Sequence, residues 1–437
     1  MHITILAIGS RGDVQPLLAL AVGLQQTGRH KVCFTASDDF GALAREHGLD
    51  FSPLGINVRE LLGRGDLAAG MESGRNTLFW VWQILQTMRP TFEQLKENTW
   101  SACRDAEMIV FSTMGFGAYH VAEKLGLPCC WAIPFPGFTR TRAFPSLAFP
   151  SLRLGGTYNL WTHVLAEQFL QGLTGRFINQ WRRERLHLPA IPLGKWPYSQ
   201  LHGQPLPMLY SFSPIVAPKP PDWGEHVHIT GYWFLDHAPD WQPPAPLVDF
   251  LQSGPPPVYV GFGSMAHRKP QQTAQLVREA LERSGQRGVL VTGWGGLAGA
   301  NLSQRSADLF TLESVPHAWL FPRVAAVVHH GGSGTTGAGL RAGVPSVLVP
   351  HTGDQPLWAR RVTELGVGPR PIPRRQLTAE RLAAAITSAV TDKDMQARAA
   401  ALGKRIRAED GVGRAIGVIE RCTALSIHGM PMKGAGP

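Results

Sequence analysis

Over the first third of the chain, short runs of apolar residues alternate with segments in which apolar residues recur every three or four positions. Residues 3–8 form one such run, residues 9–12 have turn composition, and residues 14–26 have the helical spacing. Runs that are apolar throughout are typical of strands buried on both faces of a parallel sheet, whereas the longer period indicates a helix. The pattern therefore predicts strand–helix–strand units in a doubly wound parallel sheet.

The same alternation returns in the second half of the chain, after a middle part that lacks it. The predicted strands are residues 3–8, 31–35, 107–111, 129–133, 258–262, 288–292, 309–312, 324–328 and 345–349. The predicted helices are residues 14–26, 115–125, 159–185, 271–284, 337–342, 355–365, 379–390 and 395–408. Residues 205–257 are rich in proline and tryptophan, which indicates a linker that crosses between two domains.

A chain of 437 residues is longer than a single core usually organises, so two domains are expected. The predicted fold class is α/β, with two doubly wound, Rossmann-like domains facing each other across a cleft. We assign residues 1–232 to an N-terminal domain, 233–256 to a linker and 257–437 to a C-terminal domain whose last helices can pack back on the first domain. Open sheets of this kind bind ligands at the carboxyl ends of their strands, so the site is expected in the cleft.

Composition narrows the class of protein. With 44% apolar and 17% charged residues, the chain is expected to be globular, and its net charge of +10 is spread over both halves. No basic tail or aromatic-interleaved basic stripe is present, so nucleic acid is not an expected partner, whereas anionic small molecules or transient contact with an anionic membrane surface would suit the charge. The five cysteines include no C-x-x-C pair, which argues against a disulfide framework or zinc site and favours a reducing compartment. The sequence shows no signal-peptide pattern and no apolar run of membrane-spanning length. We therefore expect a soluble, cytoplasmic protein that associates with a membrane only peripherally, if at all.

The most informative segment is the glycine-rich run His329-His330-Gly331-Gly332-Ser333-Gly334-Thr335-Thr336, which joins a predicted strand to a predicted helix. Free backbone N–H groups and the helix dipole favour an anion at such a junction, and the hydroxyl groups add donors. The run matches neither a Walker loop nor the usual G-x-G-x-x-G spacing. It predicts a metal-independent cradle for a phosphate or diphosphate. The alternative, a turn whose glycines only permit positive φ, is less favoured.

Adjacent residues on a strand point to opposite faces, so only one of the two histidines can face a ligand. We predict that His330 does, and that His329 is packed. The segment that precedes the run, Ser314-Val315-Pro316-His317, is a candidate border of a nucleobase, and Val315 and His317 are its candidate contacts.

The first predicted strand is followed by Gly9-Ser10-Arg11-Gly12-Asp13-Val14-Gln15-Pro16. Asp13 is placed to face the cleft, where a carboxylate can accept a proton from a substrate hydroxyl. A first-turn aspartate also suits a helix N-terminus by itself, and both interpretations stay open. Arg11 is either a phosphate contact or an exposed turn residue, and the second interpretation is favoured.

Two further strand ends offer polar side chains. Ser264, in a G-x-G-S turn, can donate to a phosphate oxygen, although such turns are common. Asp354 and Gln355 follow the last predicted strand, where they either cap the next helix or accept from and donate to vicinal sugar hydroxyls.

Together these residues resemble the GT-B glycosyltransferases of the nucleotide-sugar-dependent family 1 type, and most closely the sterol 3β-glucosyltransferases. The segments that carry the resemblance are GSRGDVQP at 9–16, TRTRAFP at 139–145, ITGYWFL at 229–235, VPHAWLFP at 315–322, HHGGSGTT at 329–336 and GDQP at 353–356. They run in order over nearly the whole chain. The chain differs from the plant branch, which has a catalytic histidine after the first strand.

The resemblance implies roles for the candidate residues. Asp13 is the general base, and Asp354 with Gln355 reads the sugar. The diphosphate is held by Ser264, His330, Gly332, Ser333, Gly334 and Thr335. The donor is UDP-glucose or a similar nucleotide sugar, with no cofactor and no metal, and a single displacement at an α-linked donor gives a β-glycoside.

The acceptor implied by the resemblance is lipophilic, hydroxylated and sterol-like. Residues 135–158 are aromatic and proline-rich and are the expected wall of its pocket, with Phe135, Phe138, Phe144 and Phe149 as contacts. A natural-product glycosyltransferase acting on a polyketide, flavonoid or triterpenoid with a UDP- or TDP-sugar is the main alternative. A nucleotide-sugar epimerase, or a non-enzymatic binder of nucleic acid or membranes, is less favoured.

Overall fold

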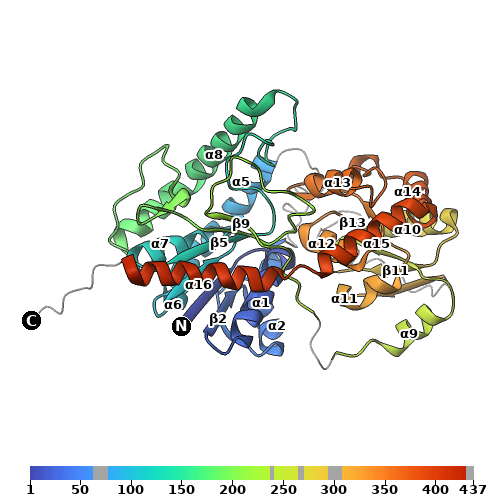
Figure 1. Cartoon of the computed structure of the whole chain (residues 1–437), viewed down its shortest axis with the longest axis horizontal. Coiled ribbons are helices and arrows are strands. Elements are labelled where there is room, and N and C mark those ends of the chain that lie inside the picture. Colours follow the sequence, from blue (N-terminus) through green and yellow to red (C-terminus); the bar gives the residue numbers. More distant parts are fainter. Residues whose placement is uncertain (63–76, 237–240, 264–269, 294–307, 430–437) are drawn as a thin grey trace, which may run out of the picture.

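The structure, a computed structural model shown in Figure 1, describes residues 1–62, 77–236, 241–263, 270–293 and 308–429. Two parallel sheets, each covered by helices, form the two halves of the molecule. The predicted α/β class with two Rossmann-like domains is therefore confirmed.

The first sheet has seven strands in the order β3-β2-β1-β4-β5-β8-β9. Their bounds are β1 His2–Ala7, β2 Lys31–Ala36, β3 Asp50–Pro53, β4 Met108–Phe111, β5 Cys129–Ile133, β8 Met208–Tyr210 and β9 Val227–Ile229. All pairs are parallel, and Ile3 lies between Val32 and Met108 in the register. A separate antiparallel pair, β6 Gln200–Leu201 and β7 Gln204–Pro205, lies outside this sheet.

The second sheet has five strands in the order β12-β11-β10-β13-β14, all parallel. Their bounds are β10 Val258–Gly261, β11 Gly288–Val291, β12 Leu309–Leu312, β13 Ala326–His329 and β14 Ser346–Leu348. In both sheets, successive strands are added first on one side of the first strand, β1 or β10, and then on its other side. The strand order therefore reverses beside β1 and beside β10, and a topological switch point lies at the carboxyl end of each. Ligands are expected beside these switch points.

Helices connect successive strands of each sheet. In the first half they are α1 Arg11–Gln26, α2 Gly41–Glu46, α3 Val58–Leu62, α5 Thr77–Met88, α6 Phe92–Cys103, α7 Phe116–Leu125 and α8 Gly155–Glu184. In the second they are α9 Ala245–Gln252, α10 Pro270–Ser284, α11 His317–Leu320, α12 Ser333–Ala342, α13 Gln355–Glu364, α14 Ala379–Thr391, α15 Lys393–Arg407 and α16 Gly411–Gly429. Single 3₁₀ turns are η1 Asp38–Phe40, η2 Arg89–Thr91, η3 Pro197–Ser199, η4 Phe321–Arg323 and η5 Arg374–Gln376.

Two sequence predictions about these elements are wrong. Residues 205–257 are not simply a linker, because β8 and β9 complete the first sheet and α9 follows them. These strands are only three residues long, and the prolines around them hide their pattern. The helix predicted from residue 337 begins at Ser333, because Gly332 is its extended N-cap with φ −62° and ψ 146°. The hydroxyl residues of the glycine-rich run therefore lie in the first turn of α12.

The last helix returns to the first half of the molecule. Figure 1 shows α16 running along α1, and Ala415 and Ile419 are buried in the same core as Ile5 and Val14. Other contacts join the halves beside the cleft. Ser213 Oγ donates to Glu409 Oε1 at 2.7 Å, and the rings of Phe212 and Trp358 lie 5.5 Å apart. These contacts fix how the two sheets face each other.

Candidate functional site

A cavity of about 1630 Å³ lies between the two halves and is lined by residues of both. The predicted site residues that line it are Asp13, Phe135, Phe138, Val315, His317, His330, Gly332, Ser333, Gly334, Thr335, Asp354 and Gln355. They come from the ends of strands that are far apart in the sequence. Ser264 lies outside the described residues.

Asp13 serves as a helix cap and also lines the cavity. Its Oδ2 accepts from the backbone N–H of Ser10 at 2.9 Å and from Ser10 Oγ at 3.1 Å. Gly9 has φ +144°, and a Cβ there would lie 2.5 Å from Asp13 Oδ2, so only glycine fits beneath the carboxylate. Burial raises the pKa of Asp13. The cap fixes one oxygen, and no described residue donates a hydrogen bond to the other.

The glycine-rich run forms the N-terminus of α12 at the cavity. Gly331 has φ +92°, which favours glycine, and Gly334 is exposed. Ser333 Oγ donates to the backbone oxygen of Pro134 at 2.7 Å and so ties this loop to the first half of the molecule. Thr335 is half-buried and lines the cavity, whereas Thr336 is fully buried. The hydroxyl of Thr335 and the backbone N–H groups are therefore the donors that this loop offers.

The His330 ring lies between two glycines. A Cβ would lie 2.9 Å from the ring at Gly263 and 2.6 Å from Nε2 at Gly332. Burial lowers the pKa of His330 to about 4, so the ring is neutral at pH 7. Its Nδ1 has no hydrogen-bond partner in the described part of the chain. His329 is fully buried and its Nδ1 accepts from the N–H of Gly331 at 3.1 Å, in agreement with the alternation of side chains along β13.

His317 begins α11 at the neighbouring strand end. Its Nε2 lies 3.3 Å from the Tyr259 hydroxyl, and its ring stacks on Phe321 with centroids 4.4 Å apart. Burial lowers the pKa of His317 to about 3, so this ring too is neutral. Val315 is nearly buried beside it. The neutral ring of His317, backed by the buried Phe321, therefore borders this part of the cavity without a charge.

Asp354 faces the cavity from the start of α13. Its Oδ2 accepts from Trp358 Nε1 at 2.7 Å. Burial raises the pKa of Asp354 to about 6, and the negative charge of Asp13 adds to the shift. The two carboxylates therefore act on each other across the cleft. Gln355 Oε1 accepts from the N–H groups of His351 and Thr352, at 2.8 and 3.3 Å, which holds the turn that carries Asp354.

The aromatic wall differs from the prediction. Phe135 and Phe138 line the cavity, but Phe144 and Phe149 do not. Phe144 turns toward the body of the first half, where its ring lies 6.2 Å from that of Trp223. The wall is completed by apolar side chains that the sequence did not single out, mainly on α5 and α8, namely Ile84, Met88, Leu147, Ala148, Phe169, Leu170 and Trp196. The sequence predicted a helix over residues 159–185 but none over α5, and the apolar spacing of a helix does not tell which face meets a ligand.

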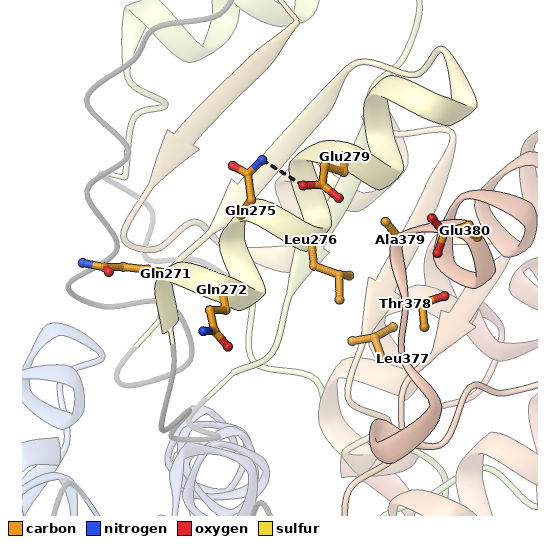
Figure 2. Close-up of a pocket in the computed structure, with 9 residues that line it drawn as sticks. All are labelled: Gln271, Gln272, Gln275, Leu276, Glu279, Leu377, Thr378, Ala379 and Glu380. Carbon is orange, nitrogen blue, oxygen red and sulfur yellow. Dashed lines mark hydrogen bonds between the residues drawn. The ribbon is translucent and has the colours of Figure 1, made fainter.

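A second, smaller cavity of about 510 Å³ lies between α10 and the start of α14. Figure 2 shows its lining, which is mostly glutamine and aliphatic side chains with Glu279 and Glu380. Gln275 Nε2 donates to Glu279 Oε1 at 3.0 Å within it. None of the predicted site residues lines it, so it adds nothing to the site.

Among the described residues, no three His, Cys, Asp or Glu side chains come close enough to hold a metal ion. In the same part of the chain, no helix has the length and apolar character needed to cross a bilayer.

Comparison with protein families gives two matches. Residues 3–145 match the glycosyltransferase family 28 N-terminal domain, and residues 298–424 match the erythromycin biosynthesis protein CIII-like C-terminal domain. The two matches fall on the two halves of the molecule, and each includes one side of the cavity.

Among curated proteins, the chain is similar to fungal enzymes named sterol 3-beta-glucosyltransferase. It is 38% identical to one from Cryptococcus neoformans over 444 residues, covering 96% of this chain and 27% of the relative. It is 38% identical to one from Emericella nidulans over 432 residues, covering 96% of this chain and 30% of the relative. The chain thus spans less than a third of the length of these relatives.

Solved structures of low sequence identity share the fold. The glycotransferase of kitacinnamycin superimposes with a TM-score of 0.71 at 21% identity, covering 97% of this chain and 99% of that one. The calicheamicin glycosyltransferase CalG4 gives 0.68 at 18% identity, covering 97% and 98%. VinC, a glycosyltransferase solved in complex with DTDP, gives 0.66 at 18% identity, covering 97% and 100%. The similarity extends over both domains and the cleft between them.

Proposed function

Because the chain belongs to the GT-B glycosyltransferases, we propose that it moves glucose from UDP-glucose to a hydroxyl of a lipophilic, sterol-like acceptor. The product would be a β-glycoside, since one displacement at an α-linked donor inverts the anomeric carbon. The names of the curated relatives support the acceptor class and the sugar. The neighbour with bound DTDP supports a nucleotide-linked donor.

The observation that carries this proposal is that one cavity joins three kinds of surface. Asp13 lies in the first turn of α1, the N-terminus of α12 belongs to the other half, and Phe135 and Phe138 form an apolar wall beside them. A transfer to a hydroxyl needs a base on one side of the anomeric carbon and a stabilised leaving group on the other. The apolar wall leaves room for a hydrophobic acceptor beside the carboxylate of Asp13.

In the proposed reaction, the acceptor hydroxyl donates its proton to Asp13 as its oxygen attacks the anomeric carbon. The bond to the diphosphate breaks, and the electron pair leaves with the nucleoside diphosphate. The oxygen of Asp13 that the Ser10 cap leaves without a donor is the expected proton acceptor. Burial raises the pKa of this carboxyl toward the working pH, which suits a base.

The donor is held from the C-terminal half. The N–H groups at the start of α12, Thr335 and His330 would bind the diphosphate, with Ser264 expected beside them, and Asp354 with Gln355 would bind the sugar hydroxyls. In this proposal the cradle consists of the neutral His330, hydroxyl groups and backbone N–H groups, so leaving-group stabilisation would be electrostatic and need no metal.

The acceptor would reach the site from a membrane. Sterol-like molecules are poorly soluble in water, and the two helices that line the apolar wall also expose apolar residues. On α5 these are Phe79 and Trp82, and on α8 they are Trp161 and Leu165. We propose a cytoplasmic enzyme in transient contact with an anionic membrane surface, to be tested by sedimentation with anionic and neutral vesicles.

Mass spectrometry of reaction products tests the function. The protein is incubated with UDP-glucose or TDP-glucose and a mixed panel of sterol, flavonoid, triterpenoid and macrolide acceptors, with and without a chelator. We expect one hexosyl unit to be added to a sterol from UDP-glucose, unaffected by the chelator. Transfer only to a flavonoid or macrolide would support the natural-product alternative, and conversion of the free nucleotide sugar without an acceptor would indicate an epimerase.

A further inference from the structure

Arg11 is the first residue of α1 and follows the end of β1 at the cleft. The sequence favours an exposed turn residue here. The side chain is indeed exposed, but it lines the large cavity together with Tyr259, His317 and His330 of the opposite half. The surface to which Arg11 is exposed is therefore the interior of the cleft.

The guanidinium of Arg11 lacks a close counter-ion. Its Nε donates to Gln15 Oε1 at 3.1 Å, and no carboxylate of the described residues lies within salt-bridge distance of it. Arg341, which lines the same cavity, is instead paired with Asp236 at 2.8 Å. Partial burial lowers the pKa of Arg11, although the group stays charged at neutral pH. A cation held without a partner in a cleft is placed to meet an anion.

Among the described residues, the glycine-rich cradle of the opposite wall carries no charged side chain. Two arginines of that half line the cavity elsewhere: Arg341, which is paired with Asp236, and Arg407, which donates to the backbone oxygen of Arg341. His317 and His330 are neutral, since burial lowers their pKa values to about 3 and about 4. The N-terminus of a helix such as α12 supplies only about half a unit charge. A nucleoside diphosphate carries a negative charge on each phosphate, which this cradle alone does not balance.

The charge of Arg11 acts directly on that wall. It influences the pKa values of Tyr259 and His317, so the guanidinium lies near the groups that border the cradle. Tyr259 is on β10, and His317 begins α11, both at the carboxyl edge of the second sheet. Arg11 is thus a residue of the first half that reaches toward the donor side.

We infer that Arg11 binds the donor diphosphate from across the cleft and adds a full positive charge to a cradle of neutral side chains and backbone N–H groups. This inference rests on the proposed function. The planar guanidinium fork matches phosphate oxygens and makes charge-assisted hydrogen bonds. Negative charge on the diphosphate grows as the glycosidic bond breaks, so the contact strengthens in the transition state. The same contact draws the two halves together around the donor.

The test compares ligands that differ only in their phosphates. Calorimetry measures the affinity of the full chain for UDP, TDP and uridine, with Arg11→Gln, Arg11→Lys and the surface control Arg104→Gln. We expect Arg11→Gln to weaken nucleoside diphosphate binding about 10- to 100-fold while leaving uridine binding within about twofold. Arg11→Lys should lie between, because it keeps the charge without the fork. Arg104→Gln should bind like the unmodified protein.

Two outcomes would overturn the inference. Equal weakening of diphosphate and nucleoside binding would mean that Arg11 only shapes the protein, and unchanged diphosphate binding would mean that it does not touch the phosphates. Thermal melting of each variant separates a folding defect from a binding defect. If the unmodified protein bound neither UDP nor TDP, the proposed function itself would fail, which is a different result from a variant that binds normally.

Discussion

The two walls of the cleft are built in different ways. Around the start of α12, the wall of the C-terminal half presents backbone N–H groups, small residues and the neutral His330, and Asp354 and His317 line it from segments that follow other strands. The wall of the N-terminal half combines Asp13 with aromatic and aliphatic side chains from α5, α8 and the segment after β5. The first kind of wall suits a ligand that is recognised by fixed hydrogen bonds. The second suits a ligand that is held by shape and exclusion of water, and therefore tolerates more variation.

The sharpest test of this contrast is Asp13→Asn, which keeps an oxygen to cap α1 but removes the carboxylate that we propose as the base. We expect kcat to fall about 100- to 10,000-fold, the usual contribution of a general base, while UDP affinity stays unchanged. Transfer kinetics and calorimetry measure the two quantities, and Asp105→Asn on the exposed surface serves as the control. A variant that kept near-normal transfer would remove Asp13 from the base role.

The charge coupling across the cleft predicts a pH dependence. Burial raises the pKa of Asp354 to about 6, so the fraction of ionised carboxylate falls as the pH drops below that value. An ionised carboxylate accepts hydrogen bonds from sugar hydroxyls, so kcat/KM is expected to fall about tenfold per pH unit below pH 6. Steady-state rates from pH 5 to 8 measure this limb. In Asp354→Asn the limb at pH 6 should disappear, and a profile that keeps it would assign the titration to another group.

The aromatic wall is tested by a matched pair of variants. Phe138→Ala removes a ring that lines the cavity, so the acceptor KM should rise about tenfold with little change in the donor KM. Phe144→Ala removes a ring that packs on Trp223 instead, so it should lower the melting temperature without this selective effect. Equal effects of both variants on the acceptor KM would mean that the wall is wrongly assigned.

The sequence predicted the two walls of the cleft unequally well. The strand ends that carry Asp13, His330 and Asp354 could be found because a buried strand, a glycine turn and a helix start are neighbours in the chain. The apolar wall could not be found, since Ile84 and Phe169 belong to separate helices whose apolar spacing gives no sign of which face meets a cavity. The prediction that Phe144 lines the cavity was wrong for a related reason: an aromatic segment does not specify which of its rings turn toward the cavity.

Regions with short strands also escaped prediction. Met208–Tyr210 and Val227–Ile229 complete the first sheet, but three residues among prolines carry no measurable period. Their place is set by pairing with β5, which is a contact over a long sequence distance. The helix start at Ser333 shows a smaller error of the same origin, because the extended conformation of Gly332 decides where α12 begins.

By itself, the sequence determined the α/β class, the alternation of strands and helices, and the loops that carry polar chemistry, because these depend on residues close together in the chain. Only the tertiary structure decided that Arg11 faces the opposite half and that the Ser333 hydroxyl donates to the backbone oxygen of Pro134. It also decided that Phe138 rather than Phe144 borders the cavity. The physical reason is that side-chain direction and burial depend on packing between distant segments. A local pattern does not encode such packing.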